Sequence, residues 1–231
     1  MPRTPFPLDA HGAIVRLRSA AWLLLTLACS PRTSDQPPAG ALTDSGQHIA
    51  ADTSRLPRKD VTVADRTRWF ERLHWPNACE DDFVQTHLTD DGGLEFHMLQ
   101  QGVSLVIVRC ALGAYQPTSV VLLLDERQSV MSATVLRFPT FESLDGKTLA
   151  PTNTAELVGE LTLLDASNAL TVLSLARQIG DCGTWARYEF PGGTPVLKAF
   201  AERVSCPENA GPRASTRSGE PPVGWKVVQP N

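Results

Sequence analysis

Several common marks of nucleic-acid-binding and membrane-spanning proteins are missing from these 231 residues. Positive charge is in deficit, with 21 Lys and Arg against 25 Asp and Glu, so the chain has no basis for binding nucleic-acid phosphates. Aromatic residues make up only 6% of the chain, so its core must rest mainly on Leu, Val and Ala. The uncharged run at residues 19–28 is too short to cross a bilayer as a helix. No internal repeat is visible.

Motifs that carry chemistry are equally scarce. The chain has no HExxH, no GxSxG elbow, no phosphate-binding glycine loop and no CxxC pair. His74, His87 and His97 lie at no metal-ligand spacing, and the acidic residues 80–82, 90 and 91 do not follow an EF-hand. The sequence therefore predicts no catalytic residue, no cofactor and no metal. A serine–histidine–aspartate set stays open, because such triads are geometric and not sequential.

Residues 1–28 are predicted to be a lipoprotein signal peptide. Arg3, Arg16 and Arg18 precede the uncharged run, which ends on a small residue. The stretch LTLAC, which ends at Cys29, resembles a bacterial lipobox, so we expect cleavage before Cys29 and a lipid on its sulfur. The alternative is a plain secretory signal. Ser30 follows the cysteine in place of Asp, which by resemblance to Gram-negative lipoproteins favours the periplasmic face of the outer membrane.

The mature chain is predicted to have two parts. Residues 29–59 hold the lipidated cysteine and a tether rich in Pro, Ser, Thr, Asp and Gly, without an apolar period. Residues 60–231 form a single globular domain. Without the leader's three basic residues and one acidic residue, the net charge is −6. We therefore expect the lipid to hold the protein at the membrane, and the acidic body to attract cationic proteins.

The periodicity of residues 60–231 predicts a mainly β (α+β) fold. Thr62 and Asp65 indicate a capping box for a helix that ends near residue 74, and a second helical turn is expected over residues 80–87. Eight strand-like runs follow, at residues 94–99, 103–109, 119–125, 130–138, 157–163, 170–176, 185–190 and 196–204. These predict an antiparallel sheet or sandwich with an N-terminal helical cap, on which Trp225 docks near the end of the chain.

Four cysteines remain beyond Cys29, and four cysteines in an exported domain usually form two disulfides. Three pairings are possible. The midpoint of residues 182 and 206 is 194, inside the turn PGGTP at residues 191–195. Strands folded about this turn place Cys182 opposite Cys206, which leaves Cys79 for Cys110.

Two blocks resemble one bacterial family. The first, VIVRCALGAYQ, covers residues 106–116, and the second, LARQIGDCG, covers residues 175–183 and is followed by Trp185 and Cys206. They are similar to the blocks C-x-x-GAY-N and GDCG…W…C of the exported proteins grouped as domain of unknown function 1176. The resemblance covers residues 94–206, with Gln116 in place of Asn. It implies an envelope location and disulfides, and it brings no catalytic residue.

The two blocks support either a folding motif or a small ligand site formed by Tyr115, Arg177, Asp181 and Trp185. Our first hypothesis for the whole protein is a non-catalytic binding module for a periplasmic protein or a cell-wall component. The alternatives are an envelope hydrolase whose activity would depend on His97 or Asp181, and a passive structural lipoprotein.

Overall fold

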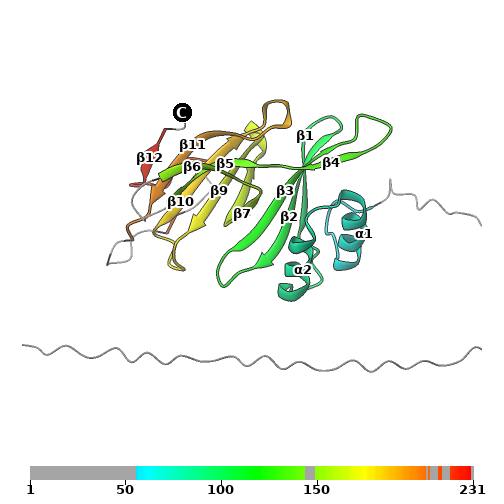
Figure 1. Cartoon of the computed structure of the whole chain (residues 1–231), viewed down its shortest axis with the longest axis horizontal. Helices are drawn as coiled ribbons and strands as arrows, with labels where there is room; N and C mark the ends of the chain where they lie inside the picture. Colours follow the sequence, from blue (N-terminus) through cyan, green and yellow to red (C-terminus); the bar gives the residue numbers. More distant parts are fainter. Residues whose placement is uncertain (1–55, 144–148, 207, 209–212, 215–218, 230–231) are drawn as a thin grey trace, which may run out of the picture. The chain divides into compact units, whose positions relative to one another are not determined.

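The computed structural model describes residues 56–143, 149–206, 208, 213–214 and 219–229 (Figure 1). The chain divides into a unit of residues 1–49 and a compact unit of residues 50–231, and the following description concerns the second. The predicted signal peptide, Cys29 and residues 29–55 of the predicted tether lie outside the described residues.

Two short helices open the domain, α1 (Val63–Leu73) and α2 (Asn77–Thr86). The predicted capping box is confirmed, because the Thr62 hydroxyl accepts from the Asp65 amide at 3.2 Å and the Asp65 carboxylate accepts from the Thr62 amide at 3.4 Å. Helix α2 begins directly after Pro76, three residues earlier than the sequence indicates. A proline with its fixed φ is compatible with the entrance of a helix, so it separates the two helices without delaying the second.

The first sheet contains β1 (Leu94–Gln100), β2 (Val103–Leu112), β3 (Pro117–Asp125) and β4 (Ser132–Val135) in this order, and β7 (Glu156–Val158) also pairs with β3. All of these pairs are antiparallel. One face packs against α1 and α2, which lie beside this sheet in Figure 1. The other face packs against the second sheet. Strand β2 is therefore buried on both faces along most of its length.

The second sheet has the order β12 (Lys226–Val228), β11 (Val196–Arg203), β10 (Gly183–Glu189), β9 (Ala169–Leu175) and β8 (Glu160–Leu164), all antiparallel. Its inner face meets the first sheet through a shared core that includes Ile107, Leu170 and Tyr188. On its outer face Trp185 packs with Trp225, so the C-terminal segment docks as the sequence predicts. Short 3₁₀ turns lie at Asp165–Ser167 (η2) and Pro191–Gly193 (η3). The predicted mainly β fold with antiparallel sheets is confirmed.

Two predicted strands are each divided in the structure. The run at residues 130–138 becomes β4 and β5 (Phe138–Ser143), and β5 pairs with β6 (Leu149–Thr154), a strand that the sequence analysis missed. The chain leaves the first sheet here, and Phe138 packs against Tyr188 of the second sheet with the ring centroids 5.0 Å apart. The run at residues 157–163 becomes β7 and β8, which belong to different sheets. The switch occurs at Gly159, whose φ is 131° and whose missing Cβ would lie 2.2 Å from the Leu173 carbonyl oxygen.

Both predicted disulfides are present. Cys79–Cys110 joins α2 to β2, and Cys182–Cys206 closes the hairpin of β10 and β11. The hairpin register puts Gly183 opposite Arg203, so Cys182 would face residue 204 and not Cys206. The two cysteines nevertheless lie just beyond the paired residues, close enough to bond.

The start of the domain differs from the sequence analysis, which placed residues 56–59 in the tether. Leu56 is buried in the core beneath the helices, and the Pro57 carbonyl oxygen accepts a 2.9 Å hydrogen bond from the Trp69 indole. Arg58 forms an ion pair with Glu126 at 2.6 Å. Composition alone could not identify these contacts, because each partner is distant in the sequence.

Candidate functional site

A cavity of about 340 Å³ is lined by residues of both sheets. The Gly159 amide, just before β8, donates to the Pro117 carbonyl oxygen of β3 at 2.9 Å. Beyond the other end of β8, the Asn168 side-chain amide donates to the Leu99 carbonyl oxygen of β1 at 3.3 Å. Strand β8 therefore crosses the first sheet from β3 to β1, and it leaves one corner of that sheet's inner face uncovered. We call the space in this corner the corner cavity.

Both sheets and several loops contribute to the corner cavity. The first sheet supplies a floor of small, apolar and charged residues, and β8 and β9 supply the opposite wall. The floor and rim include Asp91, Gly93, Glu95, Ile107, Arg109, Tyr115, Gln116 and Ser119; the wall includes Gly159, Glu160, Leu161, Leu173 and Leu175, with Arg213 beside it. Four residues of the block 106–116 therefore line this site, and the block 175–183 reaches it through Leu175.

Gln116 joins the two blocks directly. Its side-chain amide donates to the Leu175 carbonyl oxygen at 2.7 Å, and its side-chain oxygen accepts from the Leu175 amide at 2.6 Å. Leu175 lies beyond the last residue of β9 that pairs with β8, so its backbone has no strand neighbour on that side. The Gln116 side chain takes the place of that neighbour, and it holds the β2–β3 loop against the end of β9.

Charged groups of both signs surround the corner cavity. Arg109 forms an ion pair with Asp91 at 3.0 Å, while its Nε is buried and has no hydrogen-bond partner among the described residues. Partial desolvation favours the neutral form of Asp91, but the Gly93 amide and Arg109 outweigh it and hold the pKa of this carboxyl below its usual value. A hydrogen bond from His97 lowers the pKa of Glu95. Both carboxyls are therefore negative at neutral pH.

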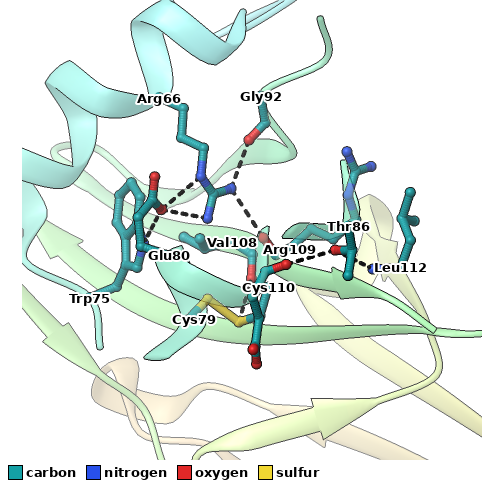
Figure 2. Close-up of a disulfide and its surroundings, with 11 residues drawn as sticks. Arg66, Trp75, Cys79, Glu80, Thr86, Gly92, Val108, Arg109, Cys110 and Leu112 are labelled. Carbon is teal, nitrogen blue, oxygen red and sulfur yellow. Dashed lines mark hydrogen bonds and ion pairs between the residues drawn. A yellow bond between two sulfur atoms is a disulfide. The ribbon is translucent and has the colours of Figure 1, made fainter. Parts of the chain in front are cut away.

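The cavity floor is supported from the helix side by Arg66 of α1, which is fully buried (Figure 2). Its Nη1 donates to the Gly92 and Arg109 carbonyl oxygens at 2.8 and 3.0 Å, and its Nε donates to the Glu80 carboxylate at 2.8 Å. Burial lowers the pKa of the Arg66 guanidinium, and Glu80 acts in the opposite direction. Arg66 belongs to no motif in the sequence. The available signal was an arginine on the helix face that also carries Trp69 and Leu73.

The four residues of the predicted ligand site are not gathered at the corner cavity. Tyr115 lies at its rim and is 45% exposed. Asp181 is fully buried in an ion pair with Arg177 at 2.6 Å, which fixes the turn before β10. Trp185 is fully buried in the cluster on the outer face of the second sheet. Of the four, only Tyr115 lines the cavity.

His97 and Asp181, the residues considered for the hydrolase hypothesis, each interact with a different partner. His97 of β1 contacts Glu95 at 3.3 Å, whereas Asp181 is held by Arg177. Within the described ranges, no three His, Cys, Asp or Glu residues are grouped so that they could hold a metal ion. No helix in this part of the chain is long and apolar enough to span a membrane.

Comparison with known proteins identifies one family. The model of that family, described as a protein of unknown function (DUF1176), matches residues 33–217. No curated protein and no solved structure matches the chain. The match covers both sequence blocks and every residue of the corner cavity.

Proposed function

Because the chain belongs to the DUF1176 family, whose description assigns no activity, we propose its role from its own residues. It is a lipid-anchored protein of the cell envelope and a non-catalytic binding module. Its ligand is a periplasmic molecule or a component of the cell wall, and it binds in the corner cavity.

One observation carries this proposal: the first sequence block and Leu175, the first residue of the second block, line one cavity of ligand size. Pockets for small ligands have volumes of roughly 300–1,000 Å³ and combine apolar walls with a few polar groups. The corner cavity, at about 340 Å³, has this composition, with Ile107 and Leu161 beside Arg109 and Glu95. Two further structural features, the Gln116 clamp and the Arg66 support, hold its rim and floor in place.

The compartment is supported by the two disulfides, since such bonds form and persist in oxidising surroundings outside the cytoplasm. The lipid anchor rests on the sequence around Cys29. Its test is metabolic labelling with a fatty acid in a Gram-negative host. The wild-type chain should be labelled and should sediment with outer membranes. A Cys29→Ala chain that is labelled equally would refute the anchor.

The binding role is tested with soluble fragments of purified peptidoglycan and with an envelope extract at low salt. The oxidised full chain should retain a defined ligand from one of these sources. Replacement of Tyr115 by alanine should weaken that binding, because its ring lines the rim. Val130→Ala is the matched control, since Val130 is 77% exposed and does not line the cavity.

Equal binding by the Tyr115→Ala and wild-type chains would mean that the ligand does not bind in this cavity. Failure of the wild-type chain to bind anything from either source would refute the binding role. Turnover of a fragment during incubation would favour the hydrolase hypothesis. An envelope defect on deletion, without any ligand, would favour a structural lipoprotein.

A further inference from the structure

We propose that the corner cavity binds a short peptide in an extended conformation, with the peptide main chain paired to β8 and its terminal carboxylate at the guanidinium groups of Arg109 and Arg213. This inference rests on the proposed function and names the ligand class of the same site.

The first observation is a free strand edge beside the cavity. Strand β8 pairs with β9 on one side only, and in the described part of the second sheet nothing pairs with its other side. The Ala176 amide bonds to the Cys182 carbonyl oxygen, so even-numbered residues of β9 direct their backbone groups towards β10. Odd-numbered residues of β9 consequently bond to β8, through its residues 160, 162 and 164.

It follows that Leu161, which lines the cavity, directs its backbone amide and carbonyl to the free edge. The Gln116 clamp confirms this alternation independently, because it bonds to odd-numbered Leu175 from the β8 side. A free edge beside a cavity is the arrangement by which extended peptides add to a sheet, with hydrogen bonds from main chain to main chain.

The second observation is the placement of charge. Arg109 lines the cavity floor, where Asp91 pairs with its Nη1 at 3.0 Å and the Arg109 side chain as a whole is 23% exposed. Arg213 adds a second guanidinium to the lining. A carboxylate is the acceptor that such donors bind most strongly, because the hydrogen bonds are charge-assisted. A peptide terminus supplies this carboxylate at the end of an extended main chain.

Acidic groups in the cavity lining also suit a peptide ligand. Glu95 on β1 and Glu160 at the start of β8 both line the cavity, so they suit the cationic end or the amide N–H groups of a peptide. They disfavour a purely anionic ligand, and the charged floor disfavours a purely apolar one, since an apolar ligand would remove water from these charged groups without replacing its hydrogen bonds.

The test uses calorimetric titration of the oxidised full chain with three probes: Ala-Ala-Ala, its C-terminal amide, and the same tripeptide with an N-methyl group on the central residue. The free acid should bind about tenfold or more tightly than the amide, because a charge-assisted hydrogen bond is lost. The N-methyl peptide should also bind more weakly, because it cannot donate to the edge of β8.

Arg213→Gln provides the test within the protein, since Arg213 is exposed and its replacement should leave the fold intact. This variant should bind the free acid several-fold more weakly and the amide unchanged. Arg127→Gln is the control, because Arg127 is paired with Asp125 in the β3–β4 turn and does not line the cavity. A general loss of structure would instead weaken the binding of the free acid and of the amide equally.

Three outcomes would overturn the inference: equal binding of the acid and the amide, no effect of the N-methyl group, or no binding of any peptide. If peptides fail while a cell-wall fragment such as a sugar still binds in a manner sensitive to Tyr115→Ala, the ligand class is wrong and the binding role stands. If neither peptides nor fragments bind, both proposals fail.

Discussion

Replacing Arg66 with methionine should destabilise the domain far more than an average substitution. The guanidinium is fully buried, and it serves Glu80, Gly92 and Arg109 at once (Figure 2). Methionine occupies part of the same volume, but it satisfies neither the carboxylate nor the two carbonyl oxygens.

The size of the destabilisation follows from the groups that lose their partner when Arg66 is replaced. The Glu80 side chain is only 17% exposed, so the variant holds a largely buried carboxylate whose remaining described partner is the Trp75 indole, at 3.0 Å. Breaking a buried ion pair by removing one partner costs about 3–5 kcal/mol. The lost contact with Phe83, whose ring centroid lies 3.7 Å from the guanidinium carbon, adds to this cost. Since a domain is stable by only about 5–15 kcal/mol, the loss is a large fraction of the total.

The assay is urea denaturation followed by tryptophan fluorescence, to which Trp69 and Trp75 beside this site contribute. The double variant Arg66→Met with Glu80→Gln is the decisive comparison. It removes the uncompensated charge, so it should recover a substantial part of the loss. A single variant that loses less than about 1 kcal/mol, or a double variant as unstable as the single one, would refute the reasoning.

Three further predictions use the same measurement. Gln116→Ala should cost about 1–3 kcal/mol, because the Leu175 amide and carbonyl lose their partner; a cost near zero would mean that water replaces the clamp. Replacing Cys182 and Cys206 together by serine should cost about 3–4 kcal/mol, since the bond closes a loop of 24 residues; unchanged stability would contradict this. Burial raises the pKa of Tyr188 to about 12, against about 10 when unfolded, so the folded state retains its proton longer. Stability should hold below about pH 10 and fall by about 2–3 kcal/mol towards pH 12, and Tyr188→Phe should lack this decrease.

Much of the local structure could be read from the sequence. Thr62 and Asp65 predict the start of α1 because a capping box is a contact between residues three apart. The Cys182–Cys206 bond was predictable because a hairpin is also local, and its turn fixes which residues face each other. The predicted strand at residues 157–163 is divided at Gly159, where the chain passes from one sheet to the other. This division was not predictable, because a glycine is required there by the close approach of Leu173 on a neighbouring strand.

The candidate site was only partly visible. The sequence blocks contained Tyr115, and they contained Arg109 and Gln116 without marking them as site residues. Arg177 and Asp181 were predicted site residues because they are charged and lie in a distinctive block, but in the structure they are paired with each other. Trp185 belongs to the core of the outer face. Charge and aromaticity in a motif do not reveal which face of a strand or turn a residue occupies.

The sequence by itself determined the helical start, most of the antiparallel strands and the Cys182–Cys206 bond, because each of these depends on periodicity or on a local hairpin; Cys79–Cys110 then followed by elimination. Only the tertiary structure decided where a site lies. The corner cavity exists because β8 runs from Pro117 on β3 to Leu99 on β1, and no local pattern encodes the angle at which two sheets cross. The same holds for Gln116 and Leu175, whose contact spans 59 residues and forms only when the sheets have packed.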